Sequence, residues 1–316
     1  MERADPPVPD RLIEWTGERC VPWLGRLEVV YEHLHRYAFA SRLAEGREVL
    51  DLGCGEGYGT CILAQRARRV TGVEIDPAAV LHARANYRLP NAEFVEGSAL
   101  DLREFRDGSQ GLVVCFEVIE HLAEQQRVLD EVRRVLGKGG MFVVSTPDRQ
   151  VYRRDQERNP FHVRELDQQE FRDFLHSRFE HVAVWGQVSG ASSLILPLGG
   201  DAGVLETSTA AFPGGVAEVV AGPPAPAYLV AIASDRPIPI SGAASLLADP
   251  EALEHVRISD MRMRGELEAR TRDVERLARR HRAALDEIER MMSTRGWRLL
   301  VRARHLRDRL AARGPG

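Results

Sequence analysis

The chain has 316 residues, of which 44% are hydrophobic and 28% charged, enough to bury one α/β core and carry an extension. Its formal net charge of −4 gives no overall attraction to nucleic acid, which is therefore not an expected partner. No apolar run approaches the roughly 18 residues of a membrane span, and residues 1–7 do not resemble a signal peptide. We expect a cytoplasmic protein whose four cysteines, none in a Cys-x-x-Cys spacing, stay reduced.

Residues 1–45 are predicted to form a cap segment. The chain is rich in proline up to about Leu27, and residues 29–44 then have the pattern of a helix. His33 and Tyr37 lie four residues apart, so they share one face of this helix. Periodicity alone is compatible with a half-buried packing face or with a face turned toward a ligand.

A buried strand that runs into a glycine-rich turn and opens a helix is predicted at residues 49–60. Gly53, Gly55 and Gly57 allow a sharp turn and a close approach of the backbone to a ligand. Asp51 precedes the turn, and the glycines are two residues apart, whereas the NAD fingerprint is Gly-x-Gly-x-x-Gly. The turn therefore indicates a nucleotide-type cofactor and argues against an NAD-type Rossmann domain.

Three more strands follow at spacings that suit one nucleotide site. Residues 70–76 form the second strand, and the carboxylate of Glu74 near its end can accept hydrogen bonds from both ribose hydroxyls. A helix over about 77–88 leads to a third strand at 93–99, whose exit would border an adenine ring. A fourth strand, within 111–122, runs into polar residues. Because ligands bind at the carboxyl ends of strands in open α/β sheets, these segments converge on one site.

The remaining elements complete a catalytic region at 46–236. A helix over 124–136, ended by the glycines of 137–140, precedes a strand at 141–146, and a polar loop at 148–160 leads to a helix over 168–176. Strands around 182–186 and 228–233 bring the total to seven. Between them, residues 187–227 are rich in Gly, Pro, Ser and Ala, which is typical of a substrate-side insertion or a mobile lid.

Beyond a linker at 237–249, residues 250–316 are predicted to form a helical tail. An apolar stripe of heptad spacing among Arg and Glu residues predicts a long amphipathic helix, compatible with self-association as a dimeric coiled coil. Residues 295–310 are basic and include Trp297. They suit peripheral contact with an anionic membrane surface, or packing of Trp297 on a neighbouring element.

The order of these segments resembles the class I S-adenosylmethionine-dependent methyltransferases over roughly residues 18–234. The resemblance implies an α/β fold, a Rossmann-like seven-stranded sheet with helices on both faces, and S-adenosylmethionine as cofactor. Where that family often has Asp, this chain has Ser98, so the adenine contact would fall to the Ser98 hydroxyl or the Ala99 backbone. The implied cofactor-binding residues are Tyr37, Asp51, Gly53, Cys54, Gly55, Gly57, Glu74, Ile75, Ser98, Ala99 and Glu117.

The same resemblance bears on the helix that precedes the first strand. In this superfamily such a helix covers the cofactor and substrate cleft, which implies that Arg19, His33, Arg36 and Tyr37 face the ligands. The half-buried packing face described above remains the alternative.

Polar residues at the end of the fourth strand are the candidates for catalysis. Glu117, Glu120 and His121 are spaced so that all three can point into one cleft, and His162 returns to the same sheet edge. Two carboxylates and two imidazoles suit a divalent cation such as Mg²⁺, Mn²⁺ or Zn²⁺. Without a metal, His121 or His162 would be a general base, and Glu117 is a further catalytic candidate.

This pattern, Glu-Val-Ile-Glu-His followed by Ser-Thr-Pro and His-x-x-Glu-Leu, resembles two metal-using groups. They are the small-RNA 3′-end 2′-O-methyltransferases and the ubiquinone-biosynthesis O-methyltransferases. The resemblance implies Glu117, Glu120, His121 and His162 as metal ligands.

Residues 14–22, 32–37, 159–165 and 295–300 together resemble bacterial methyltransferases associated with glycosyltransferases. The resemblance implies O-methylation of a sugar hydroxyl in polysaccharide or glycolipid assembly, with a glycan or small molecule as acceptor. The alternatives are 2′-O-methylation of RNA 3′ ends, O-methylation of a catechol- or quinone-type metabolite, and a non-catalytic cofactor-binding scaffold for glycan assembly.

Overall fold

A computed structural model describes residues 20–21, 27–155, 159–189, 193–198, 208–211, 218–221, 225–240, 244–247 and parts of 270–305. Two compact units divide the chain, residues 1–249 and 250–316. The described part of the second unit consists of helical segments, and Arg19 lies outside the described residues. None of the described helices is long and apolar enough to cross a membrane.

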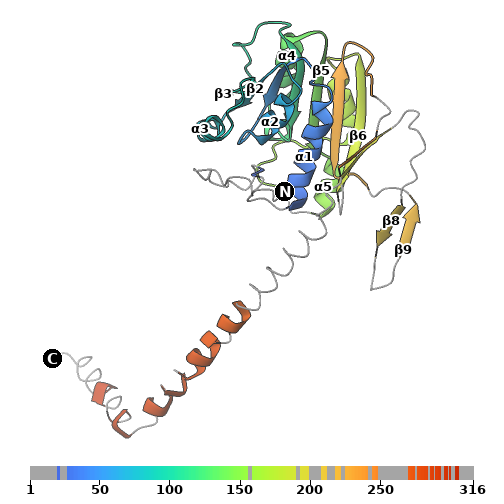
Figure 1. Ribbon diagram of the computed structural model, residues 1–316. Coiled ribbons are helices and arrows are strands. Elements are labelled where there is room, and N and C mark those ends of the chain that lie inside the picture. The colour runs from blue at the N-terminus through green and yellow to red at the C-terminus, as the bar shows by residue number, and fades with distance from the viewer. Residues whose placement is uncertain are drawn as a thin grey trace, which may run out of the picture. The chain divides into compact units, whose positions relative to one another are not determined.

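The first unit is an α/β fold with helices on both faces of one sheet (Figure 1). Its parallel half alternates strands and helices after an N-terminal helix, and its elements are α1 (Leu27–Ser41), β1 (Glu48–Leu52), α2 (Tyr58–Ala64), β2 (Arg69–Glu74), α3 (Pro77–Asn86), β3 (Ala92–Glu96) and β4 (Gln110–Phe116). The remaining elements are η1 (Ile119–His121), α4 (Gln125–Val135), β5 (Leu136–Pro147), α5 (Arg149–Asp155), α6 (Gln168–His176), β6 (His181–Ser189), β7 (Ser193–Pro197), β8 (Ser208–Ala211), β9 (Glu218–Ala221), β10 (Tyr228–Ser234) and β11 (Ser245–Leu247).

The sheet has nine strands in the order β11-β7-β6-β10-β5-β4-β1-β2-β3. Strands β3, β2, β1, β4 and β5 are parallel, whereas β10 is antiparallel to both of its neighbours. The predicted α/β fold is therefore confirmed, and all seven predicted strands are present. The number seven is wrong for the whole sheet, because β7 and β11 extend it at one edge by antiparallel pairing.

Three segments differ from the prediction. Residues 149–155, expected in a polar loop, form helix α5, because Asp148 accepts hydrogen bonds from the backbone of Gln150 and Tyr152 and so starts a turn. The glycines of 137–140, expected to end a helix as a loop, belong to β5, which begins directly after α4. Strands also occur in the two segments for which none is predicted, β7, β8 and β9 in residues 187–227 and β11 in residues 237–249.

Alternating side chains of the central strands build a core on each face of the sheet. Val49 and Leu112 pack with α1 and α2 on one face, while Leu50 and Val113 pack with α4 and α6 on the other. Strands covered on both faces are apolar at successive positions, which explains why these strands could be predicted from the sequence. The carboxyl ends of β1, β2 and β4 are left at one edge, where the glycine turn begins.

The antiparallel strands bring further residues to that same edge. Tyr228, at the start of β10, pairs with Pro147 at the end of β5 and with Gln187 near the end of β6. The ends of β5 and β6 and the start of β10 therefore lie at the same edge as the ends of β1, β2 and β4.

Candidate active site

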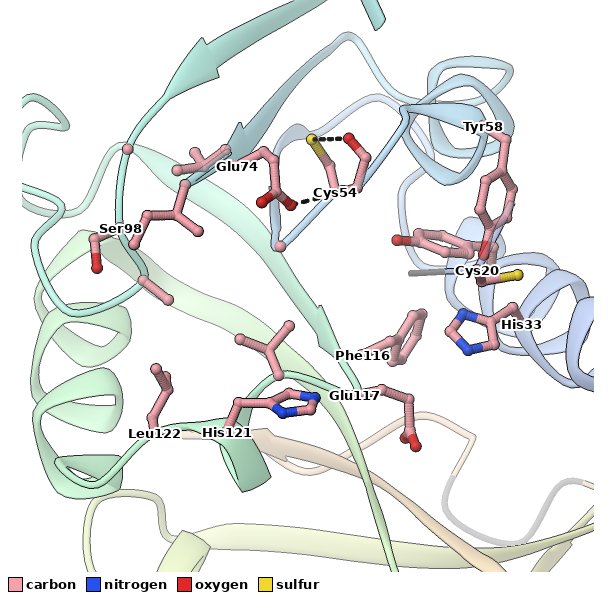
Figure 2. A pocket seen from close by; sticks show the side chains of 18 of the residues that line it. Cys20, His33, Cys54, Tyr58, Glu74, Ser98, Phe116, Glu117, His121 and Leu122 are labelled. Atoms are coloured by element: carbon pink, nitrogen blue, oxygen red, sulfur yellow. Dashed lines mark hydrogen bonds between the residues drawn. The ribbon is translucent and has the colours of Figure 1, made fainter. Parts of the chain in front are cut away.

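A cavity of about 430 Å³ opens at the carboxyl ends of β1, β2 and β4 (Figure 2). Figure 2 shows Glu74 and Ser98 toward one end of it, and Cys20, His33 and Tyr58 toward the other. Nine of the eleven residues predicted to bind the cofactor line it, namely Tyr37, Gly53, Cys54, Gly55, Glu74, Ile75, Ser98, Ala99 and Glu117. The structure thus brings these residues together, and their contact with a cofactor remains a prediction.

Asp51 and Gly57 do not line the cavity, but they contact residues that support it. Asp51 is fully buried and accepts hydrogen bonds from Thr60 Oγ1 at 2.7 Å and from the Tyr37 hydroxyl at 3.1 Å. Burial raises the pKa of this carboxyl to about 7, against the lowering effect of its two hydrogen bonds. Asp51 therefore ties α1 and α2 to the end of β1.

Two glycines of the turn are required for different reasons. Gly53 has φ 71°, and a Cβ there would overlap the Val118 side chain beside the cavity. Gly57 has φ 107° and caps α2, where a Cβ would lie 2.9 Å from Ala83, Phe94 and Tyr87. Packing of α3 against the turn, rather than approach to a ligand, explains glycine at position 57.

Glu74 is held by the backbone around it. Its Oε2 accepts from the Gly55 amide at 2.9 Å, and its Oε1 accepts from the Asp76 amide at 3.0 Å. The neighbouring Ile75 side chain is 70% exposed and available to cover a planar base. Both carboxylate oxygens are therefore fixed in orientation at the end of β2, as a ribose-binding acid requires.

Sequence reasoning missed several residues that line the cavity. Phe116 and Val118 flank Glu117 at the end of β4, so the predicted end of this strand could have indicated that they line the cavity. Cys20 and Phe161 come from segments without a regular pattern, and the resemblance carried by residues 14–22 and 159–165 did not single them out. His33, which the family resemblance placed beside the ligands, does line the cavity. Burial and the charge of Arg36 hold its pKa well below the usual range, so the imidazole is neutral.

Glu117 has an unusual backbone conformation, with φ 54°, and among the described residues no other non-glycine residue has positive φ. Its Oε1 accepts from Ser145 Oγ at 2.5 Å and lies 3.4 Å from Arg36 Nη1. Its backbone amide donates to the same Ser145 oxygen at 3.2 Å. Such strained conformations persist where surrounding contacts enforce them, often at functional sites.

Glu120, His121 and His162 form a compact group whose potential metal-binding atoms all lie within 4.8 Å of one another. The rings of His121 and His162 meet edge to face at 5.0 Å. His121 lines the cavity, and His162 lies behind it. Glu117 is not a member of this group, because its carboxylate is directed to Ser145 and Arg36. Of the four predicted metal ligands, three are therefore brought together.

Hydrogen bonds orient both imidazoles. His121 Nδ1 lies 3.0 Å from the Phe161 carbonyl oxygen, and His162 Nδ1 lies 2.8 Å from Glu165 Oε1. Because each of these oxygens accepts, each Nδ1 carries the proton, and Nε2 is the basic nitrogen in both rings. Nε2 of His162 accepts from the Asn159 side chain at 3.1 Å.

A row of aromatic rings leads from these imidazoles to α1. Tyr152 on α5 stacks on His162 with centroids 5.6 Å apart, and Tyr228 meets Tyr152 at 6.0 Å. The guanidinium of Arg36 lies 4.4 Å from the centre of the Tyr228 ring. Tyr152 and Tyr228 carried no sequence signal, because the helix and register that place them depend on long-range pairing.

Comparison with known proteins gives three findings. Residues 50–144 match the family model of the methyltransferase domain. A probable S-adenosylmethionine-dependent methyltransferase of Mycolicibacterium smegmatis is 43% identical over 187 residues, which are 56% of this chain and 69% of that protein. A ubiquinone biosynthesis O-methyltransferase of Pseudomonas aeruginosa is 30% identical over 112 residues, 33% of this chain and 46% of that protein.

Among solved structures, an S-adenosylmethionine-dependent methyltransferase of Thermotoga maritima is similar at 19% identity and a TM-score of 0.47, covering 66% of this chain and 92% of that one. The family match contains the glycine turn, Glu74 and the strand end at Glu117, which are the elements that build the cavity.

Proposed function

Because the chain belongs to the S-adenosylmethionine-dependent methyltransferases, we propose that it methylates a hydroxyl group of a sugar in polysaccharide or glycolipid assembly. The observation that carries the proposal is the set of polar groups at the exit of β4. Glu117 and His121 line the cavity there, His162 lies behind it, and the row of tyrosines adjoins His162. Carboxylate, imidazole and aromatic groups suit a neutral, hydroxylated acceptor.

The reaction is an in-line displacement. The acceptor oxygen forms a bond to the methyl carbon, the carbon–sulfur bond breaks with its electron pair going to sulfur, and S-adenosylhomocysteine leaves. Aligning the two reactants supplies up to roughly 7–11 kcal/mol of the barrier reduction. The hydroxyl proton must pass to a base, and His121 fits this role because its basic Nε2 belongs to a residue that lines the cavity.

A divalent cation would assist the same step, and the residues present fit one. Glu120 is fully buried, and its Oε1 has no hydrogen-bond partner within the described chain. Burial, followed by the charge of Glu117, raises the pKa of Glu120 well above its usual range, a cost that a cation would offset. Both imidazoles use Nδ1 on an oxygen acceptor, as metal-bound histidines commonly do.

We therefore propose Glu120, His121 and His162 as the residues that hold such a cation. When bound, it would lower the pKa of the acceptor hydroxyl. Two imidazoles and one carboxylate suit Mn²⁺ or Zn²⁺ better than Mg²⁺, which prefers oxygen ligands. Calorimetric titration of Mn²⁺ into the chelator-treated protein should show binding that Glu120→Gln weakens strongly. Full methyl transfer by protein that binds no cation would exclude the metal role.

The acceptor class is tested with S-adenosylmethionine labelled with tritium in the methyl group and a fractionated bacterial cell extract. We expect label in the carbohydrate or glycolipid fraction, recovered after hydrolysis as a methylated sugar. Label in RNA or in a small aromatic fraction would instead support one of the alternative acceptors. Cofactor binding without transfer to any fraction would favour the scaffold hypothesis.

A further inference from the structure

Arg36 is a buried cation beside the cavity, and three groups surround it. Its side chain is fully buried on α1, and Nε donates to Gln187 Oε1 at 2.6 Å. Nη1 lies 3.4 Å from Glu117 Oε1, and the guanidinium covers the Tyr228 ring. Since a buried charge is costly unless it is paired, Arg36 and Glu117 depend on each other for their positions.

The amide of Gln187 connects Arg36 to the edge of the sheet. Its Nε2 donates to Ser193 Oγ on β7 at 3.0 Å and to the Glu32 carbonyl at 3.0 Å, while its Oε1 accepts from Arg36. Gln187 itself has no exposed surface. The side chain therefore cannot turn without losing hydrogen bonds that water would not replace.

His35 extends the same connection to the outermost strand. Its Nδ1 lies 2.9 Å from Ser193 Oγ, and its Nε2 lies 2.9 Å from Ser245 Oγ on β11. A neutral imidazole donates from one nitrogen and accepts at the other. Ser193 Oγ accepts from Gln187, and the tautomer of His35 sets which of its ring nitrogens donates to its serine and which accepts. The relay Ser245–His35–Ser193–Gln187–Arg36–Glu117 thus runs from β11 to the cavity.

We propose that Arg36 is a positioning residue for Glu117, and that the additional edge strands β7 and β11 hold Arg36 in place through this relay. The inference rests on the proposed function in one respect, that Glu117 faces the methyl acceptor. Glu117 then accepts a hydrogen bond from the acceptor and fixes its orientation, while His121 takes the proton. Ser145 and Arg36 both contact Oε1 of the Glu117 carboxylate, on a backbone with positive φ.

The first test is a double-mutant cycle with Arg36→Met, Glu117→Gln and the double variant. The readouts are the initial rate of label transfer into the carbohydrate fraction and the affinity for S-adenosylhomocysteine. A small misplacement of a reacting group costs up to about 10²-fold, so each single variant should lose at least about tenfold in transfer. Because Glu117 is also predicted to bind the cofactor, transfer is measured at saturating S-adenosylmethionine for every variant, so that the loss reports the acceptor side.

If Arg36 acts through Glu117, the double variant loses no more than Glu117→Gln alone. Losses that multiply would overturn the proposal, because they would mean that Arg36 acts independently of Glu117. Arg36→Lys keeps the charge without the planar fork and should recover part of the loss. Equal loss in the Lys and Met variants would count against a charge-based positioning role.

The second test addresses the relay with variants that leave the cavity intact. Ser193→Ala removes the hydroxyl between Gln187 and His35, and transfer should fall by about fivefold, as expected for one hydrogen bond. The matched control is Ser109→Ala, at an exposed serine whose hydroxyl donates to the Arg106 carbonyl and accepts from the Gln110 side chain, outside the cavity and the relay, and it should leave transfer unchanged. Equal rates for both serine variants would overturn the part assigned to the edge strands.

A crystal structure of Arg36→Met with S-adenosylhomocysteine tests the positioning without any acceptor. The proposal expects Glu117 Oε1 to leave Ser145 Oγ while the sheet is unchanged. An unmoved carboxylate overturns it. If the unaltered protein labels no carbohydrate, the proposed function fails, and this structure still decides the role of Arg36.

Discussion

Glu74 is the last residue of β2 and Glu117 directly follows β4, yet different contacts orient the two side chains. Backbone amides of the adjoining turn hold both oxygens of Glu74, so the local chain is sufficient to prepare it. Glu117 instead depends on Ser145 and Arg36, which come from β5 and α1. A role for Glu74 could therefore be predicted from a short stretch of sequence. The partners of Glu117 could not, because they are set by packing between distant segments.

Histidines of α1 should make stability dependent on pH. Burial, followed by the charge of Arg36, lowers the pKa of His35 to about 4, and the same causes lower that of His33. The unfolded chain, with pKa values near 6.5, then binds more protons than the folded chain as pH falls through this window. The contribution of these histidines to stability is present above about pH 6.5 and is lost toward pH 4, whereas the raised pKa of Asp51 contributes in the opposite direction.

For His35 alone we expect a loss of about 2 kcal/mol between about pH 7 and pH 5. Urea unfolding at the two pH values measures it, and His35→Gln should show a smaller difference. Because the raised pKa of Asp51 acts alike in both proteins, a difference between the two pH values that is the same in the unaltered protein and in His35→Gln would show that this imidazole is not buried in neutral form.

At the scale of elements, α6 begins with a complete capping box. Asp167 accepts from the amides of Gln169 and Glu170, and Glu170 Oε2 accepts from the Asp167 amide, each at 3.0 Å. The Asp167 carboxylate also forms an ion pair with Arg149, with Oδ2 and Nη2 2.8 Å apart. This signature, an acid three residues before a glutamate, explains why the helix at 168–176 was predictable to the residue.

Asp167→Ala should destabilise the protein by about 1–2 kcal/mol, because amides of the first turn lose their acceptor. Asp167→Asn is the matched control, since it keeps a capping oxygen and removes only the charge. Urea unfolding of the three proteins gives the comparison. Affinity for S-adenosylhomocysteine should not change, and equal stability of the Ala and Asn variants would contradict the capping argument.

Prediction succeeded for elements whose signals are local and failed for those that need a partner. Buried strands such as β1 and β4 carry apolar runs next to turn residues, and their order follows from the family resemblance. Strand β11 has only three residues and exists because it pairs with β7. Helix α5 has the sequence of a charged loop and begins directly after Asp148, which is held by long-range backbone pairing with Ala227 and Leu166. The row of rings formed by Tyr152 and Tyr228 beside His162 was missed for the same reason.

At the scale of the whole molecule, the helical tail is expected to mediate self-association. Val274, Leu277, Leu285 and Met291 are each at least 50% exposed and follow the predicted heptad stripe. Light scattering should give a dimer for the full chain and a monomer for a chain ending at residue 249. Leu277→Glu in the full chain should also give a monomer. Equal masses for all three proteins would exclude this role of the tail.

Peripheral membrane contact through residues 295–310 stays a separate prediction. Trp297 and Leu299 are 41% and 65% exposed among basic residues, a combination that suits an anionic surface. The full chain should float with vesicles containing phosphatidylglycerol and not with neutral vesicles. Trp297→Glu should reduce flotation, and flotation that is independent of lipid charge and of this residue would contradict the prediction.

The central claim, that the cavity beside the glycine turn binds S-adenosylmethionine for methyl transfer, is tested most directly by calorimetric titration with S-adenosylhomocysteine. We predict one site per chain and a loss of at least about tenfold in affinity for Glu74→Gln, because a charged hydrogen-bond acceptor is removed from the ribose. Glu96→Gln, at an exposed acid that does not line the cavity, should bind like the unaltered protein. Absence of binding, or equal affinities of the two variants, would contradict the account.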